Sequence, residues 1–372
     1  MVIGNTRSYI SQLVLHNFRN HENLAVNSNG KFVLILGKNG SGKTNVLEAV
    51  SILNAGRGMR NSTNSDIITN FDKNLAEWAV IAYYQHLESS KKILFGCNFK
   101  HTSSNGKKIL KIDEEEIGKK TDILNFLRIV WLTPQMENLF LESPSVRRRF
   151  IDRMTFNFFP EHAKQVIEHE YFLQSRNKIL SDVGWDEKWL TQIEQRIADL
   201  SVKIVDNRQK CLNIINSFLS TFSKTYLRPV FFMKGEVESQ LETSNPIKVS
   251  DFIMEKLKRN RLNDSRIQKC GIGAHKSEVV VMDKEQNRHA NLCSTGEQKS
   301  MIIALLLGQS HAIYQHSNIA PILLLDEIFA HLDERRKADL IAELSQTPSQ
   351  IWISSTDTEL DRLIGNATKI QF

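Results

Sequence analysis

The chain has 372 residues, of which 41% are hydrophobic and 24% charged, with a formal net charge of +6. This composition excludes a disordered chain and predicts a globular protein with a large core and about two domains. The four cysteines form no CxxC pair, which predicts buried, reduced thiols and argues against a disulfide framework or a zinc site. No apolar run approaches the roughly 18 residues of a membrane span, so we expect a cytoplasmic protein.

The N-terminal part of the chain has the texture of an α/β protein. Residues 13–15 and 32–36 predict strands, and the second is an unbroken apolar run of the kind buried on both faces of a sheet. Residues 93–99 and 129–132 predict further strands, separated by polar turn segments such as residues 102–106.

The middle of the chain predicts helices. Between residues 160 and 225 glycine almost disappears, and Ile193, Ile197, Leu200 and Ile204 recur at helical spacing. Two helices, roughly 160–182 and 186–225, would form an antiparallel hairpin. A strand-like stretch at 229–232 and a basic run from 256 to 269 follow.

After Gly271 the α/β texture returns, with a helix at 301–307, strands at 322–325 and 351–353, and a helix after Asp333. We therefore predict a discontinuous α/β head formed by residues 1–135 and 272–372. A mainly helical lobe, residues 136–271, would be inserted between its halves.

A glycine-rich segment stands between the strand at 32–36 and the helix that follows, and it fits G-x-x-x-x-G-K-[ST]. Glycines let backbone amides close around phosphate oxygens, and the following helix adds its positive N-terminal end. Lys43 would reach the β- and γ-phosphates of ATP, and the Thr44 hydroxyl would bind Mg²⁺. The predicted ATP-binding residues here are Gly37, Lys38, Asn39, Gly40, Ser41, Gly42, Lys43 and Thr44.

Two carboxylates end a second buried strand. Asp326 and Glu327 follow the apolar residues 322–325, at the strand end where ligands bind in open α/β sheets. Asp326 would hold Mg²⁺, and Glu327 would orient and deprotonate the attacking water. Paired with the phosphate loop, these acids predict an ATPase.

The segment that begins at Ser294 resembles the signature loop of ATP-binding cassettes, which contacts the γ-phosphate of ATP held by an opposing subunit. The residues that carry this resemblance are Ser294, Thr295, Gly296, Glu297 and Gln298. Amides at a helix N-terminus suit an anion, although the same sequence is also an ordinary helix cap. The resemblance implies that ATP is held between two copies of the chain, so ATP favours a homodimer.

Three smaller segments match the same class. Gln135 falls where these proteins carry the glutamine that senses Mg²⁺ and the attacking water, and Asp333 matches the loop that couples the two sites. Transporters place a histidine after the strand at 351–353, but this chain has none there. Thr356 or Asp357 could replace it through hydrogen bonds.

The chain as a whole resembles the RecF family of bacterial recombination mediators. Matching blocks run in family order from residue 13 to residue 357, including residues 15–20, 37–45, 56–60, 131–136, 144–152 and 294–299. The family usually has Asp-Asp where this chain has Asp326 and Glu327, and residues 273–278 match only loosely. The resemblance also implies that Asn45 and Arg19 contact ATP.

This resemblance implies a weak, DNA-stimulated ATPase of recombinational repair, replication and the SOS response. An ATP-driven dimer would bind double-stranded DNA at gap junctions and, with the mediator proteins RecR and RecO, help load the recombinase. Candidate DNA contacts are Arg57, Arg60, Arg147, Arg148 and Arg149. Acids are sparse in sequence around the arginine triplet, which favours it over the 256–269 run, where a solvated helix face is at least as good an explanation.

Other functions fit less well. An SMC-type ATPase head would separate the phosphate loop from the signature by a long coiled coil, whereas the helical part here is short. A transporter ATPase subunit would carry the missing histidine and lack the helical insertion. An inactive scaffold is disfavoured by the intact Lys43, Thr44, Asp326 and Glu327, and a nuclease by the lack of a further carboxylate–histidine cluster.

Overall fold

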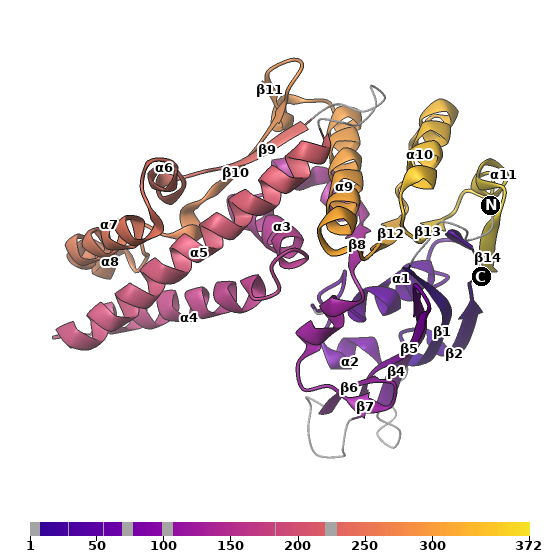
Figure 1. The fold of residues 1–372 in the computed structure, drawn as a ribbon, viewed down its shortest axis with the longest axis horizontal. Coiled ribbons are helices and arrows are strands. Elements are labelled where there is room, and N and C mark those ends of the chain that lie inside the picture. Colours follow the sequence, from indigo (N-terminus) through magenta and orange to yellow (C-terminus); the bar gives the residue numbers. More distant parts are fainter. Residues whose placement is uncertain are drawn as a thin grey trace. The chain divides into compact units, whose positions relative to one another are not determined.

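The computed structural model describes residues 8–28, 30–54, 56–68, 77–98, 107–182, 184–219 and 229–372. The chain divides into two compact units, which we call the first unit (Met1–Met136 with Leu306–Phe372) and the second unit (Glu137–Leu305). The first unit thus joins two segments that are far apart in the sequence, and the second unit is the segment between them (Figure 1). The predicted turn at 102–106 and the predicted helix end at 220–225 lie outside the described residues.

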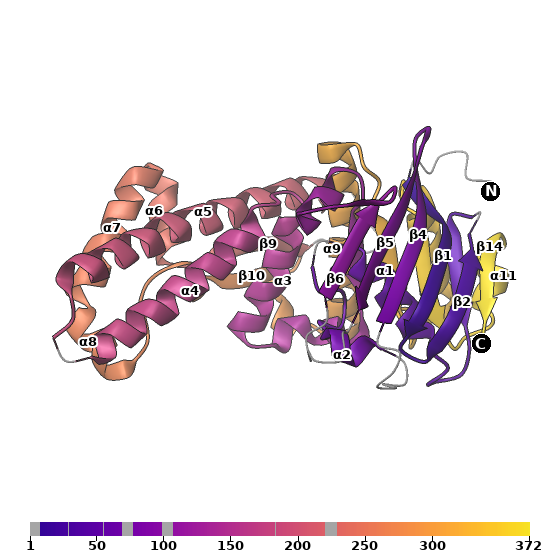
Figure 2. The ribbon, with the colours of Figure 1, turned by 90° about the horizontal axis from the view of Figure 1, so that it is seen from below.

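The first unit contains two sheets. An antiparallel sheet has the order β2-β1-β4-β5-β6-β7, and an all-parallel sheet has the order β14-β3-β13-β12-β8 (Figures 1 and 2). The strands are β1 (Ser8–Phe18), β2 (His21–Asn27), β3 (Phe32–Leu36), β4 (Glu77–His86), β5 (Ser89–Asn98), β6 (Lys107–Ile112), β7 (Glu115–Glu116), β8 (Ile129–Leu132), β12 (Ile322–Asp326), β13 (Ile351–Ser355) and β14 (Ala367–Gln371).

The parallel sheet explains the apolar runs of the sequence. All residues of β3, β8, β12 and β13 are buried, as expected for strands covered on both faces. The helices of the first unit are α1 (Lys43–Ile52), α2 (Asn64–Ile67), η1 (Lys120–Asn125), α10 (Glu334–Gln346) and α11 (Leu360–Ile364). Helices η2 (Pro134–Leu141) and α9 (Thr295–Ser317) each contain a boundary between the units.

The second unit is mainly helical. Its helices are α3 (Pro144–Phe156), α4 (His162–Ser181), α5 (Glu187–Leu219), α6 (Glu236–Thr243), α7 (Pro246–Arg259), α8 (Arg261–Ile267), η3 (Ala274–Lys276) and η4 (Ala290–Leu292). The predicted hairpin is present, because α4 and α5 pack side by side (Figure 2). The α5 stripe that includes Ile193, Ile197 and Ile204 is buried in the core of this unit.

A small antiparallel sheet, β11 (Arg288–His289), β10 (Glu278–Asp283) and β9 (Pro229–Lys234), completes the second unit. The sequence predicts that residues 272–305 belong to the α/β head. Contacts group them with the helices instead, because β10 pairs with β9 over six residue pairs from Glu278–Lys234 to Asp283–Pro229. This pairing joins segments that are distant in sequence and have no shared local signal.

Candidate nucleotide-binding site

The glycine-rich segment forms the turn between β3 and α1. Gly40 and Gly42 have φ angles of 83° and 102°, a left-handed region that favours glycine. A Cβ at Gly42 would lie 2.5 Å from Asn20 Nδ2, so that side chain would have to shift, and the left-handed conformation is the main reason for glycine there. No side chain caps α1, which leaves its N-terminal end suited to an anion.

The Ser41 hydroxyl supports the same interpretation. It is buried, and it has no hydrogen-bond partner among the described residues. Leaving a buried hydroxyl unpaired costs free energy, so such a group in a phosphate loop fits a phosphate oxygen as its partner.

Lys43 is 5% exposed, and its ammonium group contacts the backbone of this loop. Its Nζ donates to the carbonyl oxygens of Gly37 and Lys38, at 2.8 and 3.0 Å, and lies 3.3 Å from Glu327 Oε1. All three partners of the ammonium group are oxygen atoms, and a phosphate would offer the same kind of ligand.

Asp326 is the centre of a hydrogen-bonded group at the carboxyl end of the parallel sheet. Its Oδ1 accepts hydrogen bonds from Thr44 Oγ1 at 2.9 Å and from Ser354 Oγ at 2.6 Å. Ser354 lies on β13, next to β12, and its Oγ also accepts the Glu327 amide at 3.1 Å. The Thr44 hydroxyl and the Asp326 carboxylate are oxygen ligands of the kind that Mg²⁺ prefers, so the pair fits a magnesium ion.

Glu327 follows Asp326 with a φ angle of 51°, an uncommon conformation for a residue with a side chain. This turn away from the strand directs the carboxylate to Lys43. Strained backbone of this kind is concentrated at functional sites.

These residues line a cavity of about 330 Å³ in the first unit. The predicted site residues that it brings together are Asn39, Gly40, Gly42, Lys43, Thr44, Asn45, Gln135, Asp326 and Glu327, with Arg60 from the candidate DNA contacts. Met59, Thr133 and Pro134 also line it and were not predicted.

Arg19 does not line this cavity. Its Nε and Nη2 donate to the two carboxylate oxygens of Glu48, at 2.9 and 2.7 Å, beside a separate, open polar pocket that also includes Arg60 and Asn45. Its contact with ATP stays a prediction.

Asp333 is exposed and caps α10, since its Oδ1 accepts the Arg336 amide at 2.8 Å. Asp357 accepts a hydrogen bond from Lys337 at 2.7 Å, which holds the pKa of the Asp357 carboxyl below its usual range. Thr356 is exposed. The coupling role of Asp333 and the choice of γ-phosphate sensor stay predictions.

The signature-like residues 294–298 belong to the second unit. Ser294 and Glu297 form a reciprocal cap at the start of α9: the Glu297 amide donates to Ser294 Oγ at 3.3 Å, and the Ser294 amide donates to Glu297 Oε2 at 2.7 Å. Arg288 also pairs with Glu297 at 2.7 Å. The contact of this segment with the ATP of a second copy stays a prediction.

The arginine triplet lies on α3, and its members differ. Arg147 pairs with Glu278, and Arg148 donates to the Ser277 carbonyl at 2.8 Å. The inference that acids are sparse around the triplet is therefore wrong in space, because α3 packs against β10 and Glu278 lies beside Arg147. Arg149 is exposed and has no ion pair or hydrogen bond among the described residues, and Arg57 is also exposed.

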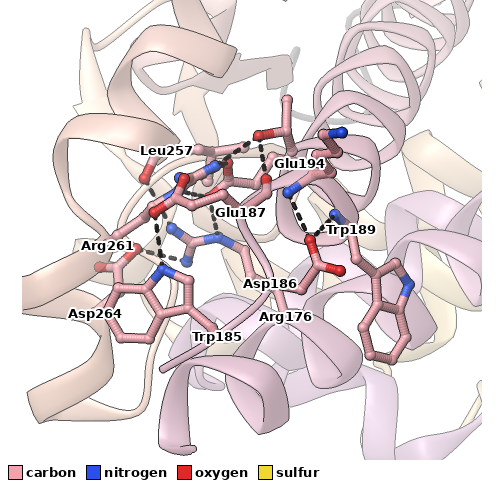
Figure 3. A network of polar contacts seen from close by, with 11 residues as sticks. Arg176, Trp185, Asp186, Glu187, Trp189, Glu194, Leu257, Arg261 and Asp264 are labelled. Carbon is pink, nitrogen blue, oxygen red and sulfur yellow. Dashed lines mark hydrogen bonds and ion pairs between the residues drawn. The ribbon is translucent and has the colours of Figure 1, made fainter. Parts of the chain in front are cut away.

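The basic residues of the run 256–269 are not all exposed at the surface. Arg261 is 5% exposed and pairs with Glu194, while Lys256 pairs with Glu236 (Figure 3 shows Arg261 within its network). Only part of this run is available to an external partner.

Beyond the lining of the cavity, two further residues, Ser354 and Glu48, were not predicted. The signal for Ser354 is its polar side chain near the end of a buried strand, just before Thr356 and Asp357. Glu48 gave a signal as well, because it is an acid in the largely apolar stretch of α1 and is 1% exposed. Among the described residues, no group of three or more potential ligands from His, Cys, Asp and Glu is placed to hold a metal, and no helix is long and apolar enough to cross a membrane.

Comparison with known proteins agrees with this geometry. The family model of the RecF/RecN/SMC N-terminal domain matches residues 9–371. The DNA replication and repair protein RecF of Rickettsia bellii (strain OSU 85-389) is 35% identical over 363 residues, which cover 97% of this chain and 98% of that protein. The RecF protein of Rickettsia massiliae (strain Mtu5) is 35% identical over 363 residues, with 98% of both chains covered.

Solved structures show the same fold. The recombination mediator protein RecF-ATPrS in the RecFOR pathway matches with a TM-score of 0.85 at 21% identity, covering 96% of this chain and 94% of that one. An SMC head bound to the C-winged helix domain of ScpA matches with a TM-score of 0.52 at 17% identity, covering 98% and 94%. The predicted fold class, an α/β ABC/SMC-type P-loop ATPase head with an inserted helical lobe, is confirmed.

Proposed function

Because the chain belongs to the RecF family of DNA replication and repair proteins, we propose that it is an ATP-driven dimer that binds double-stranded DNA at gap junctions. It would help load the recombinase there, acting in the cytoplasm with RecR and RecO. The solved relative named as a recombination mediator of the RecFOR pathway supports this role. The observation that carries the ATPase part of the proposal is the Asp326 group with its Thr44 and Ser354 hydrogen bonds, next to Lys43 and Glu327.

The geometry supports an order of events at the nucleotide. Lys43 exchanges the Gly37 and Lys38 carbonyls for phosphate oxygens, and Ser41 gains the partner that it lacks. Mg²⁺ held by Thr44 and Asp326 would neutralise charge on the β- and γ-phosphates. Glu327, released from Lys43, orients a water and takes its proton as the water oxygen attacks the γ-phosphorus. The bond to the β-phosphate oxygen breaks, and ADP and phosphate leave.

ATP then acts as a switch between one copy and two. The signature-like residues 294–298 of one copy would contact the nucleotide of the other, so that bound ATP favours the pair. Hydrolysis removes the γ-phosphate and loosens the pair. We expect turnover to be slow and to be stimulated by DNA.

Nucleotide-dependent DNA binding tests the proposal. Fluorescence anisotropy with duplex, single-stranded and gapped DNA, in the presence of no nucleotide, ADP or ATP, should show the strongest binding to gapped duplex with ATP, and salt should weaken it. Equally weak DNA binding in every nucleotide state would contradict the proposed DNA binding but not the proposed ATPase activity.

Two variants separate binding from hydrolysis. Lys43→Ala should abolish nucleotide binding and dimerisation together, because the phosphate loop loses its cation. Glu327→Gln should bind ATP and remain dimeric in analytical ultracentrifugation, because the base is lost while the phosphate contacts stay. A monomeric Glu327→Gln protein at saturating ATP would rule out the switch.

A further inference from the structure

Glu48 is a buried carboxylate that contacts two cationic side chains, although one would neutralise its charge. It lies on α1, the helix that follows the phosphate loop, and is 1% exposed. Oε1 accepts from Arg19 Nη2 and from Ser62 Oγ, both at 2.7 Å. Oε2 accepts from Arg19 Nε at 2.9 Å and from Arg60 Nη1 at 3.2 Å. One carboxylate thus faces two guanidinium groups.

The two arginines are held unequally. Arg19 donates to both oxygens of the carboxylate, to Ser62 and to the Asp66 carbonyl, and its side chain is 20% exposed. Arg60 makes a single, longer contact with Glu48, and its side chain is 40% exposed. Arg60 can therefore leave without stranding a buried charge, because Arg19 remains to neutralise it.

Arg60 is also the member of the group that reaches the nucleotide cavity. It lines that cavity and the neighbouring polar pocket, and its Nη1 donates to Asn45 Oδ1 at 2.7 Å. Asn45 is two residues after Lys43 on the same helix, so the Glu48 and Asn45 contacts together fix Arg60 beside the phosphate loop. Arg60 therefore places a guanidinium group at the wall of the nucleotide cavity, which suits a polyphosphate.

We propose that Glu48 is a positioning residue for nucleotide binding: with Asn45 it holds Arg60 ready at the wall of the cavity, and Arg19 serves as the permanent counter-charge that lets Arg60 turn to a nucleotide phosphate. This inference rests on the proposed nucleotide site and adds to it a residue that does not touch the nucleotide. If Glu48 is lost, two like charges face each other and Arg60, the more exposed one, moves away from the wall.

A double-mutant cycle on Glu48 and Arg60 tests this. The readout is the affinity for a fluorescent ATP analogue and for its ADP counterpart, measured by anisotropy on the full chain well below the unfolding temperature. Arg60→Ala and Glu48→Gln should each lower the affinity for the ATP analogue by about tenfold, because each removes one charge-assisted hydrogen bond. The double variant should be no weaker than Arg60→Ala alone, because Glu48 acts through Arg60. A purely structural role would make the losses add.

Controls keep the outcomes distinct. Glu238→Gln makes the same change at another buried carboxylate, in the second unit, and should leave nucleotide affinity unchanged. If Glu48→Gln unfolds, Arg60→Lys gives the answer: it keeps the charge, but the shorter side chain does not place its ammonium group where Arg60 Nη1 meets both Glu48 and Asn45, so the triphosphate should bind nearly as weakly as in Arg60→Ala. Additive losses, or a Glu48→Gln protein with wild-type affinity, would overturn the inference. Failure of the wild-type chain itself to bind nucleotide, or binding that Lys43→Ala does not reduce, would instead overturn the proposed function.

Discussion

The phosphate loop in the first unit and the helical core of the second unit both bury charged side chains, but they pair these charges differently. In the helical core Arg176 is 0% exposed, and it donates to Glu194 at 3.0 Å, to Asp264 at 2.7 Å and to the Leu257 carbonyl at 2.9 Å (Figure 3). Arg261 donates to the other oxygen of Glu194 at 2.6 Å. At the phosphate loop, by contrast, Lys43 is held by two carbonyls and one 3.3 Å ion pair, and Ser41 has no partner.

The difference separates charge that fixes a fold from charge that awaits a ligand. Each guanidinium nitrogen of Arg176 has a partner within the protein, so an external anion would gain little by replacing one. The partners of Lys43 are exchangeable, because a phosphate offers the same kind of oxygen with more charge. If the contrast holds, changes in the helical core should lower stability, whereas changes at the phosphate loop should lower activity.

Removing Glu194 should have the largest effect. Glu194→Ala leaves Arg176 and Arg261 buried with too few acceptors, and we expect the free energy of unfolding of the second unit to fall by about 3–5 kcal/mol. Urea denaturation measures it. Glu168→Ala on α4 is the matched control, since Glu168 pairs with Lys164 at 3.9 Å on the surface, and that pair should contribute about 0.5 kcal/mol or less. Equal losses for the two variants would show that the network contributes little.

The second unit should also be sensitive to acid through His169. This residue is 3% exposed and shares a hydrogen bond of 2.9 Å with Ser201, and burial lowers its pKa to about 3. Because the folded pKa lies below the unfolded value of 6.5, the contribution to stability is complete above pH 6.5 and is lost as the pH falls toward 3.

Between pH 7 and pH 5 the neutral His169 should account for about 2 kcal/mol of lost stability. His169→Gln should flatten the pH dependence of urea unfolding by about one proton over this range. An unchanged slope in His169→Gln would place the acid sensitivity elsewhere.

The two regions also differ in how far the sequence predicts them. The phosphate loop, β3, β12 and the helix after Asp333 follow from local signals: a glycine pattern, unbroken apolar runs and a helix cap. The Asp326 group is predictable in outline for the same reason, because parallel strands end at one edge of a sheet.

The charge pairing of the second unit has no such local signal. Arg261 reads as part of a basic surface, yet its buried partner Glu194 is 67 residues away. The pairing of β9 with β10 and the packing of α3 against β10, which places Glu278 beside Arg147, are equally non-local. Long-range partners are selected by the tertiary fold, and one sequence does not reveal them.

Ser354 sharpens the contrast from the side of the phosphate loop. Ser354→Ala removes the 2.6 Å hydrogen bond to Asp326, and we expect ATP turnover to fall about tenfold, as for one hydrogen bond to a charged group. Ser310→Ala is the matched control, because Ser310 is equally buried in the first unit and shares a 3.0 Å hydrogen bond with Ser349. Both variants should lose similar thermal stability, while only Ser354→Ala slows turnover. Equal turnover in the two would remove Ser354 from the site.

The arginine triplet gives the smallest effect and extends the contrast to the surface of the second unit. Arg147 and Arg148 are tied to Glu278 and to the Ser277 carbonyl, whereas Arg149 is exposed and has no partner among the described residues. If unpaired charges are the ones that bind ligands, we expect Arg149 to be the member of the triplet that contacts a DNA phosphate.

Arg149→Ala should then weaken binding to gapped duplex a few-fold at moderate salt and reduce the slope of log affinity against log salt by about 1. The effect should be the same for every DNA sequence, because a phosphate contact carries no base information. Arg147→Ala is the informative comparison: it should lower the stability of the second unit, since Glu278 loses its partner, while the salt slope changes less. A larger change of slope in Arg147→Ala than in Arg149→Ala would mean that DNA displaces Glu278, and that pairing in the free protein does not mark an arginine as structural.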